Sequence, residues 1–169
     1  LTSLKGDRLD AVLKGGARWT AKNGFGEIAD LDRIEHGGCL DGADPEEVSQ
    51  RAKERGKGQL GSLGSGNHFL EIQRVDEVFD PALARSFGLE PGRVTVMIHC
   101  GSRGLGHQVC DDHLRILARS VSRNGIAIPD RQLCCAPLDS DEGKAYMGAM
   151  QAAANFALAN REAIGSRVR

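Results

Sequence analysis

The chain has 169 residues, enough for one domain of ordinary size with a substantial apolar core. Its hydrophobic content of 40%, charged content of 27% and formal net charge of -1 exclude a disordered chain and a strongly basic nucleic-acid-binding chain, although a local basic patch remains open. No apolar run reaches the roughly 18 residues that a transmembrane helix needs, so we expect no membrane partner.

The cysteine content points to a reducing compartment. There are five cysteines, an odd number, and none forms a CxxC pair, which does not suit a secreted disulfide framework. We therefore expect a cytoplasmic protein. Because the chain opens on Leu1 rather than methionine, within a helix-like pattern, we also expect a piece of a larger protein.

The N-terminal third combines helical segments with a glycine-containing loop. Apolar residues at helical spacing predict an amphipathic helix from Leu4 to Lys14, which Gly15-Gly16 should end. Residues 17–40 show no clear period. Asp44-Pro45-Glu46-Glu47 is typical of a helix start, with an N-cap, a proline at the first position and acids in the first turn, and predicts a helix to about Arg55.

The rest of the chain mixes strand and helix patterns. Residues 67–75 alternate between two faces, with Phe69, Glu71 and Gln73 on one of them, and residues 93–99 form a β-branched run typical of a buried strand. Helical patterns cover residues 81–87, 104–122 and the long alanine-rich segment 139–162. Because strands and helices do not alternate as βα units, we expect an α+β fold, with a mixed sheet and packed helices.

A glycine-rich loop, Gly61-Ser62-Leu63-Gly64-Ser65-Gly66, leads into the first strand at Asn67-His68. Its backbone amides can turn inward and cradle an anion, and the Asn67 amide can hydrogen bond beside that anion. The spacing matches neither the Gly-Lys-Ser/Thr phosphate loop nor the GxGxxG motif. Taken alone, a histidine such as His68 on a mostly apolar strand is more often structural than a metal ligand.

The second strand ends in a similar way. His99 stands at its carboxyl end and is followed by Cys100-Gly101-Ser102-Arg103 and a helix start. Arg103, the Ser102 hydroxyl and the helix dipole together suit a phosphate or sulfate. The alternative is an ordinary strand-to-helix turn with a surface arginine. We hypothesise that the two glycine-rich ends meet, so that His68 and His99 form a site for metal and phosphate.

Two further segments carry weaker signals. Glu35-His36-Gly37-Gly38-Cys39 has the residue types of a partial metal site, but it lacks the second cluster that a zinc finger needs. The basic residues Arg51, Lys53, Arg55 and Lys57 could meet a polyanion, although such a segment is usually a solvated helix face.

The two glycine-histidine segments together resemble the signature pair of the RtcB family of GTP-dependent RNA ligases. They are residues 61–71, GSLGSGNHFLE, and residues 99–106, HCGSRGLG, in the order that the family has. Four other stretches are also similar to that family: residues 35–37, 51–56, 136–140 with Tyr146, and 153–161. Nearly the whole chain therefore takes part in the resemblance.

The resemblance implies an RtcB-like α+β enzyme that joins an RNA 3′-phosphate or 2′,3′-cyclic phosphate end to a 5′-hydroxyl end, in tRNA splicing or RNA repair. GTP and two manganese ions (Mn2+) are the implied cofactors. A histidine is guanylylated, GMP passes to the RNA 3′-phosphate, and the 5′-hydroxyl then displaces it. The implied partners are RNA, as tRNA halves or broken RNA ends, and an archease-like activator.

By the same resemblance, His68 would bind one manganese ion and His99 the other. Asn67 would lie near the GTP phosphates, and Phe69 and Glu71 towards the guanosine. The whole run that lines the GTP site would be Asn67, His68, Phe69, Leu70 and Glu71. The residues implied in catalysis are Asn67, His68, His99 and Arg103, with Arg103 close to phosphate groups.

The resemblance also places residues 1–169 as the central portion of a single catalytic domain. The acidic and cysteine metal ligands would precede Leu1, and another metal histidine and the guanylylated histidine would follow Arg169. Since two histidines are too few ligands for a stable two-metal site, we predict that the chain alone does not ligate RNA. The alternative is a non-catalytic metal- and nucleotide-binding module on the same scaffold, and a third is that both glycine loops are plain turns.

Overall fold

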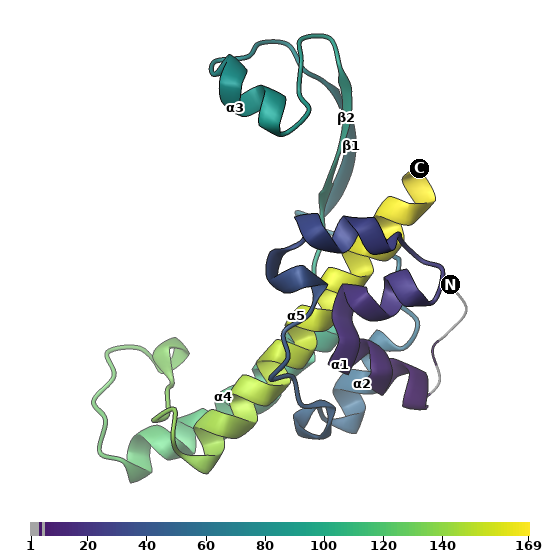
Figure 1. Cartoon of the computed structure of the whole chain (residues 1–169). Helices are drawn as coiled ribbons and strands as arrows, with labels where there is room; N and C mark the ends of the chain where they lie inside the picture. Colours follow the sequence, from purple (N-terminus) through teal and green to yellow (C-terminus); the bar gives the residue numbers. More distant parts are fainter. Residues whose placement is uncertain (1–3, 5) are drawn as a thin grey trace. The chain divides into compact units, whose positions relative to one another are not determined.

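The computed structural model describes residue 4 and residues 6–169, and the chain divides into two compact units. Unit 1 comprises Leu1–Ser62 and Gly101–Arg169, and unit 2 comprises Leu63–Cys100. Unit 1 is helical, whereas unit 2 contains a small antiparallel sheet (Figure 1). The predicted α+β class is therefore confirmed.

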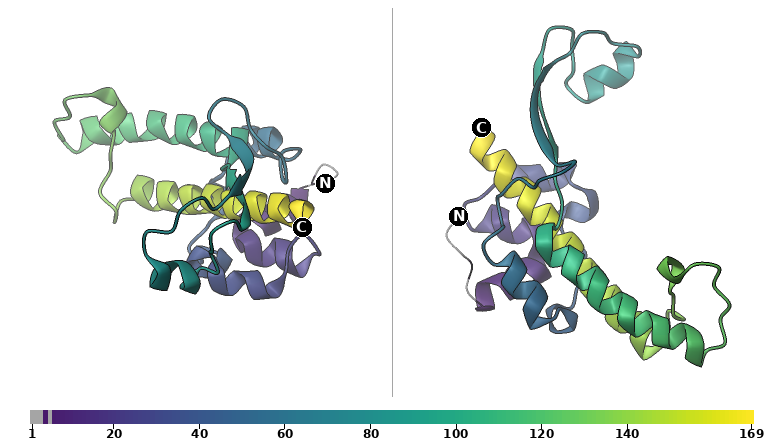
Figure 2. Two further views of the ribbon diagram at one scale, coloured as in Figure 1. Left: turned by 90° about the horizontal axis from the view of Figure 1, so that it is seen from above. Right: turned by 180° about the vertical axis from the view of Figure 1, so that it is seen from behind.

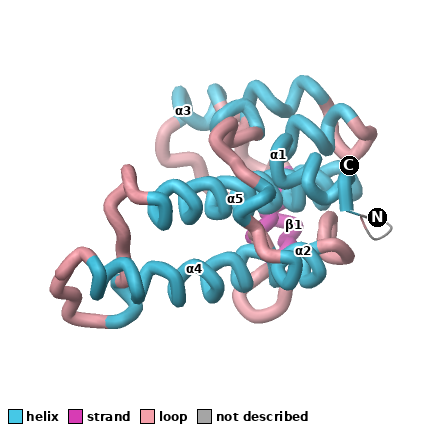
Figure 3. The backbone as a smooth tube through the Cα atoms, turned by 90° about the horizontal axis from the view of Figure 1, so that it is seen from below, coloured by secondary structure: helices cyan, strands magenta, loops and turns pink. Residues whose placement is uncertain are grey.

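Unit 1 is built around one long helix, α5 (Asp141–Val168), which lies between α1 (Gly6–Lys22) and α4 (Arg103–Arg123) (Figures 2 and 3). The short helix α2 (Gln50–Gly56) packs on α4. The connecting segments contain short 3-10 helices: η1 (Ile28–Arg33), η2 (Glu35–Gly38), η3 (Pro45–Glu47) and η4 (Arg131–Leu133). Across residue 4 and residues 6–169, no helix is both long enough and apolar enough to cross a membrane.

Helix α5 supplies the centre of the core through small side chains. Ser140 caps it by accepting a hydrogen bond from the Gly143 N–H, and Asp141 and Glu142 occupy its first turn. Its most buried apolar residues recur every three or four positions: Ala149, Ala152, Phe156, Ala159 and Ala163. Alanine at four of these positions lets α1 and α4 approach α5 closely. The predicted long helix is thus confirmed, and it continues to Val168.

The predicted end of the first helix was wrong. Gly15-Gly16 does not end α1, because the helix kinks at Gly16 (φ 54°, ψ -140°) and then continues to Lys22. Only glycine adopts this left-handed φ without strain. A Cβ at Gly16 would also collide with the Gly38 carbonyl oxygen, so the kink lets two backbones touch.

The segment that begins at Asp44 is not the single helix that was predicted. Asp44 caps η3 by accepting a hydrogen bond from the Glu46 N–H, but Val48 is extended (φ -94°, ψ 116°) and breaks the helix. Ser49 then caps α2 through its hydroxyl, which accepts from the Ala52 N–H. Val48 is buried in the core, so its packing outweighs helix continuity here.

Unit 2 is a β-hairpin of β1 (Phe69–Arg74) and β2 (Val94–His99), joined by a segment that contains the short helix α3 (Pro81–Ser86) (Figure 1). The antiparallel register pairs Phe69 with His99 at one end and Arg74 with Val94 at the other. Both predicted strands therefore exist, within one or two residues of the predicted boundaries.

The expectation of a mixed sheet with a buried second strand was wrong. The sheet of the described residues has two antiparallel strands, and β2 is largely exposed, with Val94 65% and Val96 42% accessible. Ile72 of β1 is 76% accessible. β-Branched residues favour a pleated backbone, but their presence does not say what covers that surface.

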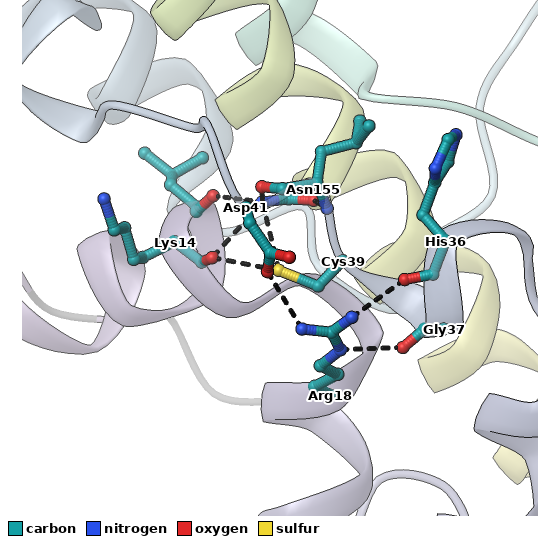
Figure 4. Close-up of polar contacts among 9 residues, drawn as sticks. Lys14, Arg18, His36, Gly37, Cys39, Asp41 and Asn155 are labelled. Atoms are coloured by element: carbon teal, nitrogen blue, oxygen red, sulfur yellow. Dashed lines mark hydrogen bonds and ion pairs between the residues drawn. The ribbon is translucent and has the colours of Figure 1, made fainter.

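A buried asparagine, Asn155 of α5, ties three segments of unit 1 together (Figure 4). Its Nδ2 donates to the Leu13 carbonyl at 2.9 Å and the Leu40 carbonyl at 3.1 Å, and lies 3.3 Å from the Lys14 carbonyl. Its Oδ1 accepts from the Leu40 N–H at 2.8 Å. Cys39 lies in the same cluster, where its Sγ donates to the Lys14 carbonyl at 3.2 Å. The asparagine thus satisfies backbone groups that the kink in α1 leaves without helical partners.

The partial metal motif at residues 35–39 is held by an arginine and not by a metal-ligand set. Arg18 donates to the carbonyls of His36 and Gly37, each at 2.9 Å, and pairs with Asp41 at 2.9 Å (Figure 4). Burial raises the pKa of the Cys39 thiol, which keeps it protonated and unreactive. No cluster of three or more histidine, cysteine, aspartate or glutamate residues suited to a metal occurs in the described part of the chain.

An acidic pair lies where the C-terminal part of α5 meets η1. Glu162 is buried against the backbone of Gly26, and its Oε1 has no hydrogen-bond partner among the described residues. Burial, together with the nearby charge of Asp30, raises the pKa of the Glu162 carboxyl. The Arg169 guanidinium donates to Asp30 Oδ2 at 2.7 Å and lowers the pKa of Asp30.

We expect Glu162→Gln to stabilise the chain at neutral pH by about 1 kcal/mol, because it removes a buried charge beside the Asp30 carboxylate. Since the folded-state pKa of Glu162 is raised, its ionisation opposes folding, and this cost is complete only above the raised pKa. The advantage of glutamine should therefore shrink as the pH falls through that pKa. Urea unfolding at neutral and at mildly acidic pH measures the difference.

The matched control is Glu46→Gln, at an exposed position in the same unit, which should change the free energy of unfolding by less than about 0.5 kcal/mol. Destabilisation by Glu162→Gln at neutral pH would show instead that the Glu162 charge supports the fold.

Candidate nucleotide and metal site

The two histidines that the sequence singles out lie together at one end of the hairpin in unit 2. His68 directly precedes β1, and His99 is the last residue of β2. Their ring centroids are 6.4 Å apart and the rings are inclined at 67°. Phe69, the register partner of His99, packs edge-on against the His99 ring at 5.1 Å. The antiparallel pairing therefore brings together two imidazoles that lie far apart in the sequence.

His68 has an unsatisfied ring nitrogen, which is the property expected of a metal ligand. Its Nδ1 is buried and has no hydrogen-bond partner among the described residues. A buried polar atom without a partner costs free energy unless a ligand, an ion or water completes it. A neutral imidazole nitrogen suits manganese among other divalent metals. The described residues supply no third metal-binding side chain beside these two histidines.

The run that follows His68 presents alternating side chains along β1. By register, Phe69 pairs with His99 and Glu71 with Met97, so these four side chains share one face of the hairpin. The Glu71 carboxylate accepts a hydrogen bond from Gln73 Nε2 at 2.9 Å, which orients it on that face. The predicted common face of Phe69, Glu71 and Gln73 is confirmed.

The two remaining members of the run take other positions. Leu70 pairs with Ile98 and lies on the opposite face of the hairpin from Phe69. Asn67 is exposed and directly follows Gly66, whose φ of 73° makes the turn into the strand. Its amide is therefore open to a ligand in solution.

Arg103 belongs to unit 1, where it begins α4 in an unusual backbone conformation. Its φ of 57° is left-handed, and His36 is the only other non-glycine residue with a positive φ among those described. A non-glycine residue in this region carries strain that surrounding contacts must hold in place. The Arg103 Nε lies 3.4 Å from the Ser62 hydroxyl, and the next amide, that of Gly104, donates to Gln59 Oε1 at 2.9 Å.

A second buried asparagine of α5, Asn160, organises the same region of unit 1. Its Oδ1 accepts from the Gly61 N–H at 2.7 Å and the Ser62 N–H at 3.2 Å, and its Nδ2 donates to the Gly101 carbonyl at 3.1 Å. The first two amides of the glycine-rich loop are thus bonded to Asn160 and are not turned toward an anion, whereas an anion at the amides of residues 63–66 stays a prediction. One signal could have pointed to Asn160, which is the presence of an amide side chain within the apolar, alanine-rich part of a helix.

Comparison with known proteins supplies the family. The family model described as "tRNA-splicing ligase RtcB" matches residues 1–169. The chain is 57% identical over 161 residues to tRNA-splicing ligase RtcB of Archaeoglobus fulgidus, an alignment that covers 95% of this chain and 33% of the relative. It is 55% identical over 161 residues to RNA-splicing ligase RtcB of Mycobacterium tuberculosis, covering 95% and 37%. The tRNA-splicing ligase RtcB of Pyrococcus horikoshii is 57% identical over 162 residues, covering 96% and 19%.

The chain therefore spans about a third of the Archaeoglobus and Mycobacterium relatives, and a smaller part of the Pyrococcus one. The match runs along its whole length and includes both glycine-histidine segments and the asparagine-containing helix. This chain belongs to the RtcB family of tRNA-splicing ligases.

Proposed function

We propose that this chain forms part of the active site of an RNA ligase that joins RNA 3′-phosphate or 2′,3′-cyclic phosphate ends to 5′-hydroxyl ends. The reaction would use GTP and manganese and would serve tRNA splicing or RNA repair. The observation that carries the proposal is the pairing of His68 and His99 at the end of the hairpin, in a chain that belongs to the RtcB family. The unpartnered Nδ1 of His68 supports a ligand at that point.

In this proposal the two histidines hold manganese, one ion each. His68 offers its buried Nδ1, while the ring of His99 is kept in place by its edge-on contact with Phe69. When bound, manganese would act as a Lewis acid on phosphate oxygens. Two nitrogen donors do not complete two metal sites, so acidic, cysteine and further histidine ligands from the longer family protein would complete them.

The face of β1 that carries Phe69 and Glu71 would receive the guanosine of GTP. The Phe69 ring offers an apolar surface beside the histidines, and the Glu71 carboxylate can accept hydrogen bonds from the donor edge of guanine. Gln73 holds that carboxylate in orientation. Asn67, exposed before the strand, would hydrogen bond to the GTP phosphates.

Arg103 would bind phosphate groups, because its guanidinium and the start of α4 both favour an anion. The RNA partner would be tRNA halves or broken RNA ends, and an archease-like protein would activate the enzyme. We place the reaction in the cytoplasm, where the thiol of the buried Cys39 and the other cysteines stay reduced.

A segment exchange tests the proposal. Residues 1–169 would replace the matching segment of the Archaeoglobus fulgidus relative, which is 57% identical over that stretch. The chimera is expected to ligate an RNA 3′-phosphate end to a 5′-hydroxyl end, and to need both GTP and Mn2+. The intact relative serves as the control for assay conditions.

A chimera that folds and binds GTP and Mn2+ but forms no ligated RNA would favour the non-catalytic metal- and nucleotide-binding module. Ligation by the isolated 169-residue chain would refute the expectation that further metal ligands are required.

A further inference from the structure

We propose that Asn160 is a positioning residue that fixes the chain on both sides of unit 2 and thereby orients Arg103. Ser62 is the last residue of unit 1 before unit 2, and Gly101 is the first residue after it. Asn160 bonds to both: its Nδ2 donates to the Ser62 carbonyl at 3.3 Å and the Gly101 carbonyl at 3.1 Å. One side chain thus sets the spacing between the outgoing and returning chain. The functional part of the inference rests on the proposed phosphate-binding role of Arg103.

The outgoing side is fixed most firmly. The Oδ1 of Asn160 accepts from the amides of Gly61 and Ser62, at 2.7 Å and 3.2 Å. Arg167, two turns further along α5, donates to the Gly61 carbonyl at 2.7 Å. The Ser62 hydroxyl in turn donates to the Gln59 carbonyl at 2.5 Å, so the start of the glycine-rich loop is held on several sides.

The returning side contains the strained residue. Arg103 follows Gly101 by two positions and has a φ of 57°, a conformation that an L-residue keeps only when its neighbours hold it. Asn160 holds Gly101 on one side of it, and Gln59 caps the Gly104 amide on the other. The Ser62 hydroxyl then meets the Arg103 Nε at 3.4 Å. Backbone and guanidinium of Arg103 are therefore both set by the segment that Asn160 binds.

Helix α5 carries a second buried asparagine, Asn155, with which Asn160 can be compared. Asn155 is equally buried and also bonds to backbone groups, but its partners are in α1 and at residues 39–40. A purely structural role predicts similar consequences for both asparagines. A positioning role predicts that only Asn160 changes Arg103.

Nuclear magnetic resonance on the 169-residue chain separates these roles. The first readout is hydrogen exchange at the Gly61 and Ser62 amides. The second is the Arg103 Nε–Hε signal, recorded before and during titration with inorganic phosphate. The variants are Asn160→Ala, Asn160→Asp and, as the matched control, Asn155→Ala.

In Asn160→Ala we expect at least about tenfold faster exchange at both amides, a shift of the Arg103 Nε–Hε signal, and about tenfold weaker phosphate binding. Asn160→Asp keeps the acceptor for the Gly61 and Ser62 amides but loses the donor to the Ser62 and Gly101 carbonyls. This variant should keep most of the protection of the Gly61 and Ser62 amides, while the Arg103 signal still shifts. It therefore tests whether Asn160 positions Arg103 even if the alanine variant does not fold. Asn155→Ala should leave the Arg103 signal and its response to phosphate unchanged, and any faster exchange that it causes should be shared by buried amides across unit 1 and not confined to Gly61 and Ser62.

An Arg103 signal that is the same in wild type and in both Asn160 variants overturns the proposal. An equal shift in Asn155→Ala also overturns it, because the effect would then be loss of packing. If the wild-type Arg103 signal does not change when phosphate is added, the proposed phosphate-binding role of Arg103 is refuted. In that case amide exchange and the signal without phosphate still decide whether Asn160 positions it.

Discussion

Replacing His68 or His99 by alanine in the segment-exchanged ligase is expected to lower RNA ligation by more than about 100-fold. Each imidazole would be a direct metal ligand, and even residues that only support a metal ligand commonly change affinity or activity by about 10- to 100-fold. In the metal-free protein, His68→Ala removes a buried, unpartnered Nδ1, so this variant should fold at least as well as the parent. The loss is therefore expected in catalysis and Mn2+ binding, and not in stability.

His107→Ala provides the matched control. His107 is exposed on α4 and its ring lies 3.4 Å from Asp111, so its removal should leave ligation within about twofold of the parent. Ligation would be measured by gel separation of RNA products, and Mn2+ binding to the segment-exchanged ligase by electron paramagnetic resonance of free Mn2+. Parent-like ligation in both His68→Ala and His99→Ala would remove these residues from the metal site.

Local patterns in the sequence were enough to predict most of the elements. The long alanine-rich run predicted α5, and alternation predicted β1. These patterns involve only residues that are close in the sequence, so they can be recognised without knowledge of the fold. The kink in α1 could not be predicted in this way, because Gly16 contacts the backbone of Gly38, which is distant in the sequence.

In the candidate site too, features that depend on local patterns were predicted, and those that depend on distant contacts were not. The histidine-glycine segments predicted that His68 and His99 matter, and the strand pattern predicted that Phe69 and Glu71 share a face. That His99 joins this face required the register of the hairpin, which the residues of one strand do not contain. Asn160 lies in a stretch that resembles the family but was not predicted as a site residue, because its partner Gly61 lies 99 positions away in the chain.

Exposure of β2 could not be predicted for a related reason. A β-branched run is compatible with a strand buried on both faces and with one that is open, and composition alone does not separate them. The hairpin of unit 2 carries accessible apolar side chains on both strands, among them Ile72 and Met97. The candidate binding face and the exposed apolar side chains thus occur on the same two strands, so a substitution there can affect both ligand binding and the apolar surface.

Asn155→Ala is expected to destabilise unit 1 by about 3 kcal/mol, the largest stability effect that we predict. The side chain is fully buried and serves Leu13, Leu40 and Cys39, so its removal leaves buried backbone groups without partners (Figure 4). Each unsatisfied buried group costs about 1–3 kcal/mol, and water cannot reach them without opening the contact between α1 and α5. The kink at Gly16 should loosen as well, because the Asn155 side chain packs directly against Gly16, where even an added Cβ would lie only 3.2 Å from Asn155 Oδ1.

Urea unfolding followed by circular dichroism measures this loss, with Asn23→Ala as the matched control. Asn23 is exposed at the end of α1 and donates to the Trp19 carbonyl at 2.8 Å, where water can replace it, so its removal should cost less than about 1 kcal/mol. A similar, small loss in the two variants would mean that the backbone around Leu13 and Leu40 finds other partners. A large loss confined to Asn155→Ala would establish this asparagine as the link that holds the kinked α1, residues 39–40 and α5 in one core.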